Sequence, residues 1–152
     1  MRIQSVCLLL VLFSATVLSL DLDTKGRYEK FIKQHIDKHM IVNKCDAEIR
    51  KRKISWFNIN TKRHECKQSN TFIMANIKTV KSVCDGEGEP YKNMTRSTEY
   101  FDIVFCNLTN QAAKYPKCHY DGKALKHRII IKCEQGLPVH YHGDTQVILR
   151  ID

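Results

Sequence analysis

Apolar residues recur every three or four positions near the start of the chain, between Asp23 and Met40. This spacing places them on one face of a helix. The face consists of Tyr28, Phe31, Ile32, His35 and Ile36. Asp23 or Thr24 can cap the first turn, because both side chains accept hydrogen bonds from free backbone amides. The pattern predicts an amphipathic helix with a histidine on or beside its apolar face.

A second helix is predicted from Asn43 to about Arg52, and a third from Asn76 to about Cys84. Gly86 follows the third segment, where glycine often ends a helix. The run Asp85–Pro90, "DGEGEP", holds the densest turn signal of the chain and predicts a surface loop.

Beyond this loop the sequence changes to short segments rich in β-branched and aromatic residues, which are typical of strands. These segments are Tyr100–Cys106, Lys126–Cys133, Val139–Tyr141 and Val147–Ile151. Helices in the first half and strands in the second predict an α+β fold, with about three helices packed on an antiparallel sheet.

The first 20 residues have the pattern of a secretory signal peptide. Arg2 gives a positive start, and Val6–Phe13, "VCLLLVLF", gives an apolar core that is too short to span a bilayer as a helix. Small residues at Ala15 and Ser19 predict cleavage near residues 19–20. We therefore expect a secreted, extracellular chain. Its residues 21–152 should form a single domain, because about 132 residues are too few for two.

Secretion changes the reading of the cysteines and of two sequons. Cys7 lies in the predicted signal peptide, and an even number of cysteines in the secreted remainder predicts three disulfides. The six are Cys45, Cys66, Cys84, Cys106, Cys118 and Cys133. Spacing alone leaves roughly 15 pairings open. The Asn-x-Thr sequons at Asn93 and Asn107 are candidates for glycosylation.

The mature chain is strongly basic. Removing residues 1–20 takes only Arg2 from the 25 Lys and Arg of the sequence, which leaves 24 against 16 Asp and Glu and a net charge of +8. A basic surface favours polyanionic partners, and nucleic acid, sulfated sugars and anionic membranes all qualify. Charge alone does not separate these partners from a merely soluble basic surface.

Three candidate sites stand out, and each has an ordinary structural alternative. His35 lies on the inner side of the first predicted helix, where a histidine is more often a hydrogen-bonded core residue than a catalyst. His140 and His142 would share one face of a strand as a metal pair, but no free cysteine and no carboxylate at suitable spacing accompanies them, so no metal or cofactor is predicted. The stretch Cys66–Met74, "CKQSNTFIM", is either a strand entrance or one wall of a reaction site.

Four segments together resemble the pancreatic ribonuclease (ribonuclease A) superfamily over essentially the whole mature chain. They are "KFIKQHID" at Lys30–Asp37, "CKQSNTFI" at Cys66–Ile73, "KYPKC" at Lys114–Cys118 and "CEQGLPVHY" at Cys133–Tyr141. The family signature Cys-Lys-x-x-Asn-Thr-Phe is intact from Cys66 to Phe72. The resemblance implies a ribonuclease A-like fold, with a bent antiparallel sheet, and RNA as the partner.

The resemblance also implies an endoribonuclease reaction and its catalytic residues. A neutral His35 would remove the proton of an RNA 2′-hydroxyl, and a protonated His140 would give a proton to the departing 5′-oxygen, leaving a 2′,3′-cyclic phosphate. An imidazole titrates near about 6.5, so two histidines can hold opposite protonation states near neutral pH. Lys67 would stabilise the negative charge of the transition state. No metal is required.

The same resemblance implies substrate-binding roles. Gln34 would donate a hydrogen bond to a phosphoryl oxygen, and Asn70 would steady Lys67. Thr71 would recognise a pyrimidine edge, which makes C or U the base on the 5′ side of the cut, and Tyr141 would pack under that base. The remaining candidates would contact neighbouring phosphates or the second base, and they are Lys30, Lys33 and Glu134.

With six cysteines rather than eight, the mature chain resembles the angiogenin-like branch of the superfamily. That likeness implies the disulfides Cys45–Cys106, Cys66–Cys118 and Cys84–Cys133. It also implies a looser preference at the second base, because the missing fourth bridge belongs to a loop that shapes that site.

Three positions depart from the family pattern. His142 stands where the family usually has an aspartate that orients the catalytic imidazole, so we expect a modest loss of activity, and Asp144 is a candidate substitute. Gly143 replaces a glutamine that obstructs the pyrimidine pocket in angiogenin, which predicts an open pocket unless Gln146 intrudes. Phe105 replaces an aspartate that tunes C against U in some members.

A basic run falls where angiogenin carries a nuclear-targeting cluster, which makes nuclear uptake a candidate property. The run is Arg50, Lys51, Arg52 and Lys53. Its alternative is a solvated helix end favoured by the helix dipole. A monomeric, cationic angiogenic or antimicrobial factor, acting on a receptor or an anionic bacterial membrane, is therefore the second functional hypothesis. A disulfide-rich growth factor is the third, and it requires the family motif to be a coincidence.

Overall fold

The computed structural model describes residues 22–145 of the chain. The predicted signal peptide, its cleavage position and the predicted strand Val147–Ile151 lie outside the described residues. The N-terminal helix is described over residues 22–35, and the short 3-10 helix η1 (Val42–Lys44), α2 (Cys45–Lys51) and α3 (Ile77–Ser82) follow it. No helix in the described part has the length and apolar character needed to cross a membrane.

The helices form where the sequence predicts them, for identifiable local reasons. Asn76 caps α3, because its side chain accepts a hydrogen bond from the backbone amide of Thr79 (2.9 Å). α2 has acidic residues in its first turn and basic residues in its last turn, an order that the helix dipole stabilises. The N-terminal helix buries Phe31 and His35 against the sheet.

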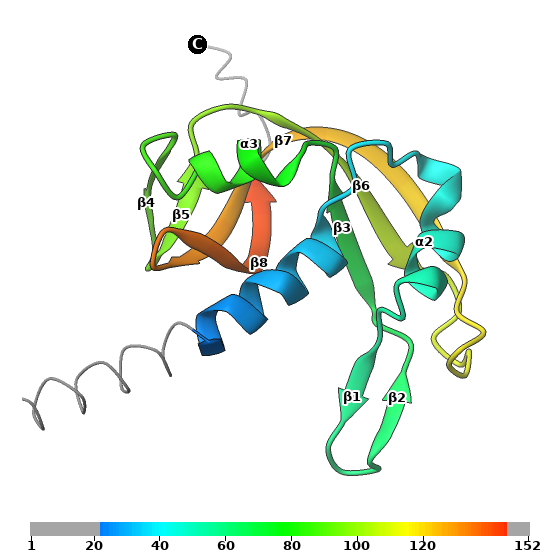
Figure 1. Cartoon of the computed structure of the whole chain (residues 1–152). Coiled ribbons are helices and arrows are strands. Elements are labelled where there is room, and N and C mark those ends of the chain that lie inside the picture. The colour runs from blue at the N-terminus through cyan, green and yellow to red at the C-terminus, as the bar shows by residue number, and fades with distance from the viewer. Residues whose placement is uncertain (1–21, 146–152) are drawn as a thin grey trace, which may run out of the picture.

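Six antiparallel strands form one bent sheet that carries the helices (Figure 1). The strand order is β3 (Ser69–Ile73), β6 (Phe101–Leu108), β7 (Tyr120–Glu134), β5 (Met94–Ser97) and β4 (Gly88–Tyr91), and β8 (Leu137–Thr145) also pairs with β7. In Figure 1, β7 arches across the molecule, and register shifts interrupt its pairing with β8. The predicted α+β fold, with three helices on a bent antiparallel sheet, is confirmed.

The predicted surface loop Asp85–Pro90 is wrong in its second half, because Gly88 begins strand β4. Within this run, Gly86 adopts the left-handed backbone of a turn, with a φ of 95°. Gly88 has a different purpose. A Cβ at this position would lie 2.4 Å from the backbone oxygen of Val83, so only glycine allows the hairpin to pack this closely. Of the two glycines that gave the turn signal, Gly86 therefore lies in a true turn, whereas Gly88 is needed for close packing.

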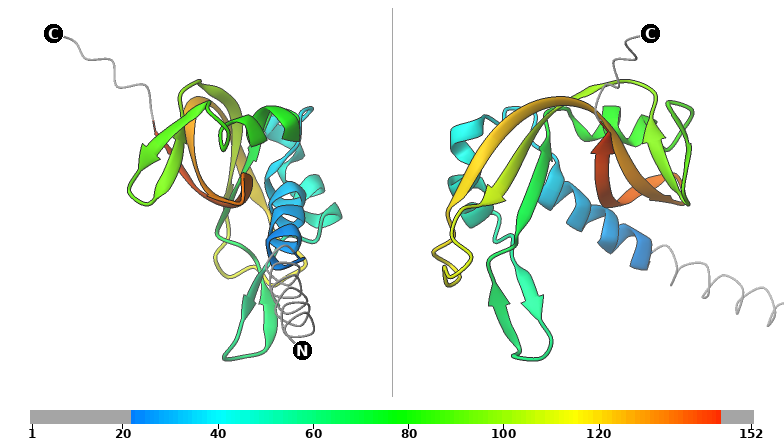
Figure 2. Two further views of the ribbon diagram at one scale, coloured as in Figure 1. Left: turned by 60° about the vertical axis from the view of Figure 1, so that its left-hand side comes forward. Right: turned by 180° about the vertical axis from the view of Figure 1, so that it is seen from behind.

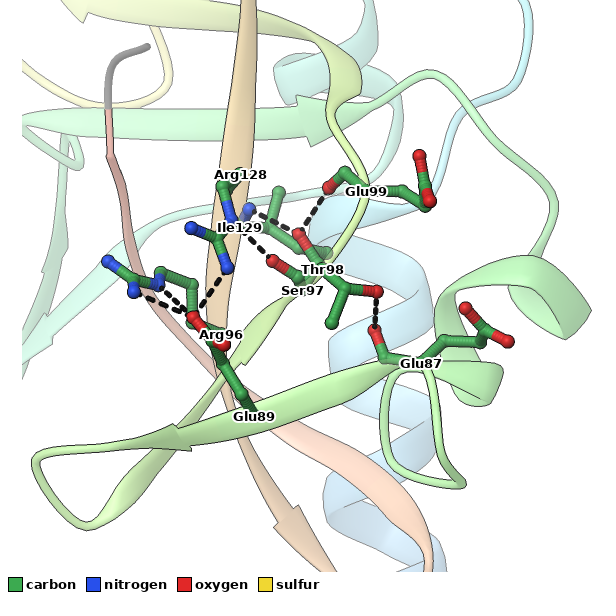
Figure 3. Close-up of polar contacts among 8 residues, drawn as sticks. All are labelled: Glu87, Glu89, Arg96, Ser97, Thr98, Glu99, Arg128 and Ile129. Atoms are coloured by element: carbon green, nitrogen blue, oxygen red, sulfur yellow. Dashed lines mark hydrogen bonds and ion pairs between the residues drawn. The ribbon is translucent and has the colours of Figure 1, made fainter. Parts of the chain in front are cut away.

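Hydrogen bonds and ion pairs fix the β4–β5 hairpin to β7 (Figure 3). Ser97 is completely buried, and its hydroxyl accepts a hydrogen bond from the backbone amide of Ile129 (2.9 Å). The Arg128 guanidinium donates to the Ser97 carbonyl (2.8 Å) and to the Glu89 carboxylate (2.5 Å). Arg96 donates to the same carboxylate (2.7 Å), and these two arginines hold the pKa of Glu89 below its usual value.

A separate two-stranded hairpin, β1 (Trp56–Asn58) and β2 (Arg63–Glu65), has no counterpart among the strands predicted from the sequence. Figures 1 and 2 show it projecting from the body of the molecule, beyond the end of β3. Three of its large apolar side chains are exposed. They are Trp56, Phe57 and Ile59.

Two apolar clusters and three disulfides hold these elements together. One cluster lies between α2, β3 and β6 and includes Phe72, and the other lies between the N-terminal helix, α3 and β7 and includes Phe31. The disulfides are Cys45–Cys106, Cys66–Cys118 and Cys84–Cys133, which is the predicted pairing. Each closes a loop of about 50 to 60 residues, so each is expected to stabilise the fold by about 2–4 kcal/mol.

Candidate active site

His35, the predicted base, lies at the end of the N-terminal helix and is buried against β3. Its Nδ1 lies 2.8 Å from the backbone oxygen of Thr71. A carbonyl oxygen only accepts, so Nδ1 carries the proton and Nε2 of a neutral ring keeps its lone pair. The imidazole also stacks on the ring of Tyr141, with centroids 5.1 Å apart. These contacts leave Nε2 as the nitrogen that can accept a proton.

The surroundings of His35 favour the neutral form. Burial lowers the pKa of His35 to about 3, and the positive charges of Lys67 and His140 act in the same direction. The hydrogen bond to the Thr71 carbonyl opposes this effect but is the smaller influence. His35 is therefore neutral near pH 7, which is the form that the predicted base requires.

His140, the predicted acid, lies on β8 with an exposed side chain. Its pKa is lowered first by partial burial, and then by the charges of His142, Lys67, Lys132 and Arg27, in that order. The His142 ring is 6.4 Å away, centroid to centroid, and meets His140 edge-on.

Asp144 does not take over the role of the aspartate that is missing at position 142. Its carboxylate pairs with Nδ1 of His127 (2.5 Å) and accepts a hydrogen bond from the Tyr141 hydroxyl (3.0 Å). Within residues 22–145 the structure gives the His140 ring no hydrogen-bond partner. Gln146, the other residue in question for the pocket, lies outside the described residues.

Lys67 completes the group, and a chain of hydrogen bonds sets its position. Its Nζ donates to Oδ1 of Asn70 (2.9 Å), and Nδ2 of Asn70 donates to the backbone oxygen of Gln34 on the N-terminal helix (2.8 Å). Burial, followed by the charge of Lys30, lowers the pKa of Lys67 to about 8. The ammonium group is still mostly protonated at neutral pH and can stabilise a developing negative charge.

Two adjoining recesses meet at these side chains. Both are lined by Gln34, His35, Lys67, His140 and Tyr141. The wider recess, about 510 Å³, continues past residues of the N-terminal helix, β1, β5 and β7. The narrower recess, about 310 Å³, continues past residues of β3, β6 and β8. We call the two together the groove. A larger recess of about 700 Å³ lies between β2 and the loop after β6, and contains none of the three predicted catalytic residues.

Thr71 and Phe105 line the narrower recess, together with His142, Gly143 and Asp144. The predicted base-recognition residue and all three positions that depart from the family pattern thus surround one space. The missing side chain at Gly143 leaves this space open within the described residues.

The remaining predicted substrate-binding residues are not all in the groove. Lys30 lines the wider recess, whereas Lys33 does not. Glu134 is not a lining residue either. Its carboxylate pairs with Arg27 (2.6 Å) and Lys132 (3.3 Å), and Arg27 is the main cause of its lowered pKa.

One member of the basic run has a structural purpose that the sequence did not reveal. The Arg52 guanidinium donates to the backbone oxygens of Ile36 (2.7 Å) and Lys33 (3.1 Å) and pairs with Asp37 and Glu48. It therefore joins α2 to the N-terminal helix. The other three members of the run are exposed: Arg50, Lys51 and Lys53.

Both sequon asparagines are exposed. Asn93 lies in the turn between β4 and β5 with a φ of 66°, and Asn107 lies on β6. Glycosylation at either stays a prediction. Among residues 22–145 there is no group of three or more His, Cys, Asp or Glu side chains arranged to hold a metal ion.

Comparison with known proteins gives the class that this fold and groove define. The family model for pancreatic ribonuclease matches residues 26–142. The chain belongs to the pancreatic ribonuclease family, on its angiogenin-like branch.

Individual relatives agree with this assignment. The chain is 32% identical to "Ribonuclease-like 3" of Danio rerio over 140 residues, which cover 90% of this chain and 91% of that protein. It is 33% identical to "Angiogenin" of Mus musculus over 120 residues, covering 76% and 77% of the two chains. The solved structure of zebrafish RNase5 is 36% identical, with a TM-score of 0.74 and coverage of 79% of this chain and 95% of that one.

Proposed function

We propose that this protein is a secreted, metal-independent endoribonuclease that cleaves RNA on the 3′ side of pyrimidines. The observation that carries the proposal is the pairing of two differently placed histidines around Lys67. His35 is buried and neutral, whereas His140 reaches into the same groove from an exposed position on β8. Membership of the pancreatic ribonuclease family supports ribonuclease activity as the use of this arrangement.

The first step is an internal transesterification. Nε2 of His35 takes the proton of the 2′-hydroxyl, and the 2′-oxygen forms a bond to the neighbouring phosphorus. The bond from phosphorus to the 5′-oxygen breaks, and His140 gives that oxygen its proton. Lys67 stabilises the charge that grows on the nonbridging oxygens, because its ammonium group is held before the reaction begins. Gln34 donates a hydrogen bond to the same phosphate.

The products of this step are a 2′,3′-cyclic phosphate and a strand with a free 5′-hydroxyl. The cyclic phosphate is hydrolysed in a second step, in which His140 removes a proton from water and His35 returns its proton to the 2′-oxygen. The two histidines therefore exchange roles and regain their starting protonation states.

The narrower recess takes the base on the 5′ side of the cut. Thr71 offers its backbone and hydroxyl to the edge of a pyrimidine, and Tyr141 packs beneath the ring. The predicted signal peptide and the three disulfides support secretion, since disulfides persist in oxidising compartments. A monomer suffices, because all of these residues come from one chain.

A second candidate function is an angiogenic or antimicrobial activity that depends on receptor or membrane binding. It is favoured by the similarity to angiogenin and by the exposed basic side chains on and beside α2. His140→Ala separates the two readings. It should abolish RNA cleavage, while an activity that depends only on binding would survive.

The proposal is tested with the dinucleotides CpA, UpA and ApA in the presence of a chelator, over about pH 2 to 9, a range that includes the limb expected from His35. We expect cleavage of CpA and UpA, a cyclic phosphate product and a bell-shaped pH profile. Equal cleavage of ApA, or loss of activity with the chelator, would contradict the proposed specificity or mechanism.

A further inference from the structure

We propose that Trp56 is a stacking platform for a base of the RNA strand on the 3′ side of the cut, so that the β1–β2 hairpin is part of the substrate-binding surface. The inference rests on the proposed function. It assigns to the hairpin a substrate contact outside the dinucleotide that is cleaved.

The position of Trp56 is the first argument. Its side chain lines the wider recess together with Lys67 and His140, yet 53% of its surface is exposed to solvent. A large aromatic ring that is half exposed beside a reaction site has a free face for another flat ring. The next residue, Phe57, is 48% exposed but does not line the groove. Successive side chains of a strand point to opposite faces, and the Phe57 ring meets His64 at 5.2 Å.

The charge of the wider recess is the second argument. Arg27, Lys30, Lys67 and Lys132 all line it. Arg27 and Lys132 pair with a single carboxylate, that of Glu134, so positive charge remains in excess. Cationic side chains that follow a phosphate backbone, combined with an aromatic ring on which a base can stack, are the recurring composition of surfaces for single-stranded nucleic acid.

The direction of the strand is the third argument. In the proposed reaction the narrower recess, with Thr71 and Phe105, takes the base on the 5′ side of the cut. His140 protonates the 5′-oxygen of the departing strand, which must therefore continue through the wider recess. Trp56 lines only that recess, so its partner is a nucleotide on the 3′ side.

A direct binding test is available because Trp56 is the single tryptophan of the chain. The probe is a hexadeoxynucleotide of cytosine and adenine, two bases that RNA shares, which has a phosphate backbone but lacks the attacking 2′-hydroxyl. Stacking should quench the tryptophan emission in a saturable way, and added salt should weaken the binding. If the oligonucleotide inhibits cleavage while the emission does not change, it binds without reaching Trp56 and the proposal is wrong. Quenching by anionic vesicles but not by the oligonucleotide would also overturn it, in favour of a lipid surface.

The kinetic test compares kcat/KM for CpA with kcat/KM for a tetranucleotide that extends CpA on its 3′ side. Trp56→Ala should lower the ratio of extended to dinucleotide activity by about 5- to 150-fold, which corresponds to the loss of one stacked base. Trp56→Phe should restore part of the ratio, because it keeps an aromatic face. Phe57→Ala is the matched control and should leave the ratio unchanged, since it removes a neighbouring aromatic ring of similar exposure that lies outside the groove.

The remaining outcomes are also decisive. Equal losses on both substrates would show that Trp56 supports the site rather than the strand, and a ratio unchanged in Trp56→Ala would exclude stacking. A ratio that falls only for a substrate extended on the 5′ side would refute the proposed direction. If the wild-type protein cleaved neither substrate, the proposed function would fail, and the fluorescence titration would then judge the base-stacking role of Trp56 by itself.

Discussion

The two histidines of the groove lie on two walls that differ in burial and in hydrogen bonding. His35 belongs to the helix wall, which we define as the N-terminal helix together with the segment Cys66–Ile73 that contains β3, and His140 belongs to the β8 wall. On the helix wall the imidazole bonds the Thr71 carbonyl, Lys67 bonds Asn70, and Asn70 bonds the backbone of the helix. His35 and Lys67 each have a hydrogen-bond partner within the protein.

The β8 wall has the opposite character. The His140 side chain is exposed, and the ring that meets it from the same strand is that of His142, a second imidazole rather than a carboxylate. The carboxylate of Asp144 is committed to His127 and Tyr141. Partial burial, followed by the charges of positive neighbours, lowers the pKa of His140.

The two walls therefore differ in how the protonation state of each histidine is set before the reaction. Burial and a fixed hydrogen bond on the helix wall keep the proposed base, His35, neutral and oriented before the substrate arrives. The proposed acid, His140, would instead depend on the phosphate of the substrate, because an anion beside it favours the imidazolium form. Mutations on the two walls should therefore change different quantities.

The largest effects are expected from His35→Ala and His140→Ala. Each should lower kcat/KM for CpA by about 10²- to 10⁴-fold, because each removes one proton transfer of the first step. The two should differ in stability. His35→Ala empties a buried position and should lower the melting temperature, whereas His140→Ala removes an exposed side chain and should leave the melting temperature nearly unchanged.

His39→Ala is the control for these variants, because His39 is an exposed histidine outside the groove. It should keep both activity and melting temperature. Equal losses of stability in the two catalytic variants would contradict the contrast between the walls. Retained cleavage in either variant would remove that histidine from the mechanism.

Lys67→Ala should have the next largest effect, a loss of about 10²- to 10³-fold in kcat, because the preorganised charge that stabilises the transition state disappears. Asn70→Ala keeps the ammonium group but removes its hydrogen-bond acceptor and the link to the Gln34 carbonyl. A loss of up to about 10²-fold is expected from this misplacement. Initial-rate kinetics on CpA measure both variants, with melting temperatures to check folding. A larger loss in Asn70→Ala than in Lys67→Ala would show that Asn70 acts directly on the substrate.

The sequence predicted the helix wall better than the β8 wall. The helix wall depends on local order: the helical spacing around His35 and the continuous motif Cys66–Phe72 place its residues directly. On the β8 wall the same sequence offered Asp144 as a substitute acceptor. The side chain instead pairs with His127 on β7, a contact between strands that no local pattern encodes.

Elements that depend on distant contacts were missed or misread for the same reason. The strands β1 and β2 have three residues each, which is too short for a period-two pattern to be seen. β4 contains a glycine and a proline that are read as turn signals, although Gly88 packs against Val83. Arg52 was counted with a basic surface run, but its partners Ile36 and Lys33 come from the preceding helix.

The smallest expected effect is on the pH dependence of kcat/KM, whose falling limb we assign to His140 on the β8 wall. The pH profile of kcat/KM reports the pKa values of the essential acid and base in the free enzyme. kcat/KM falls as the acid loses its proton. Because the pKa of His140 lies below its ordinary value of 6.5, we expect the falling limb of the wild-type profile below pH 6.5. The rising limb belongs to His35 and should lie near pH 3.

Replacing His142 should move only the falling limb. His142→Ala removes one positive neighbour and should raise the pKa of His140, and His142→Asp should raise it further by adding a negative one. Each unit of upward movement increases kcat/KM on the alkaline side about tenfold, while activity at the maximum changes little. His39→Asp, with the same change of side chain outside the groove, should leave the limb in place. If the order wild type, Ala, Asp does not appear in the position of the falling limb, either His140 is not the acid or His142 does not influence its charge. A His140→Ala profile that lacks this limb would distinguish the two, because it would identify His140 as the titrating group.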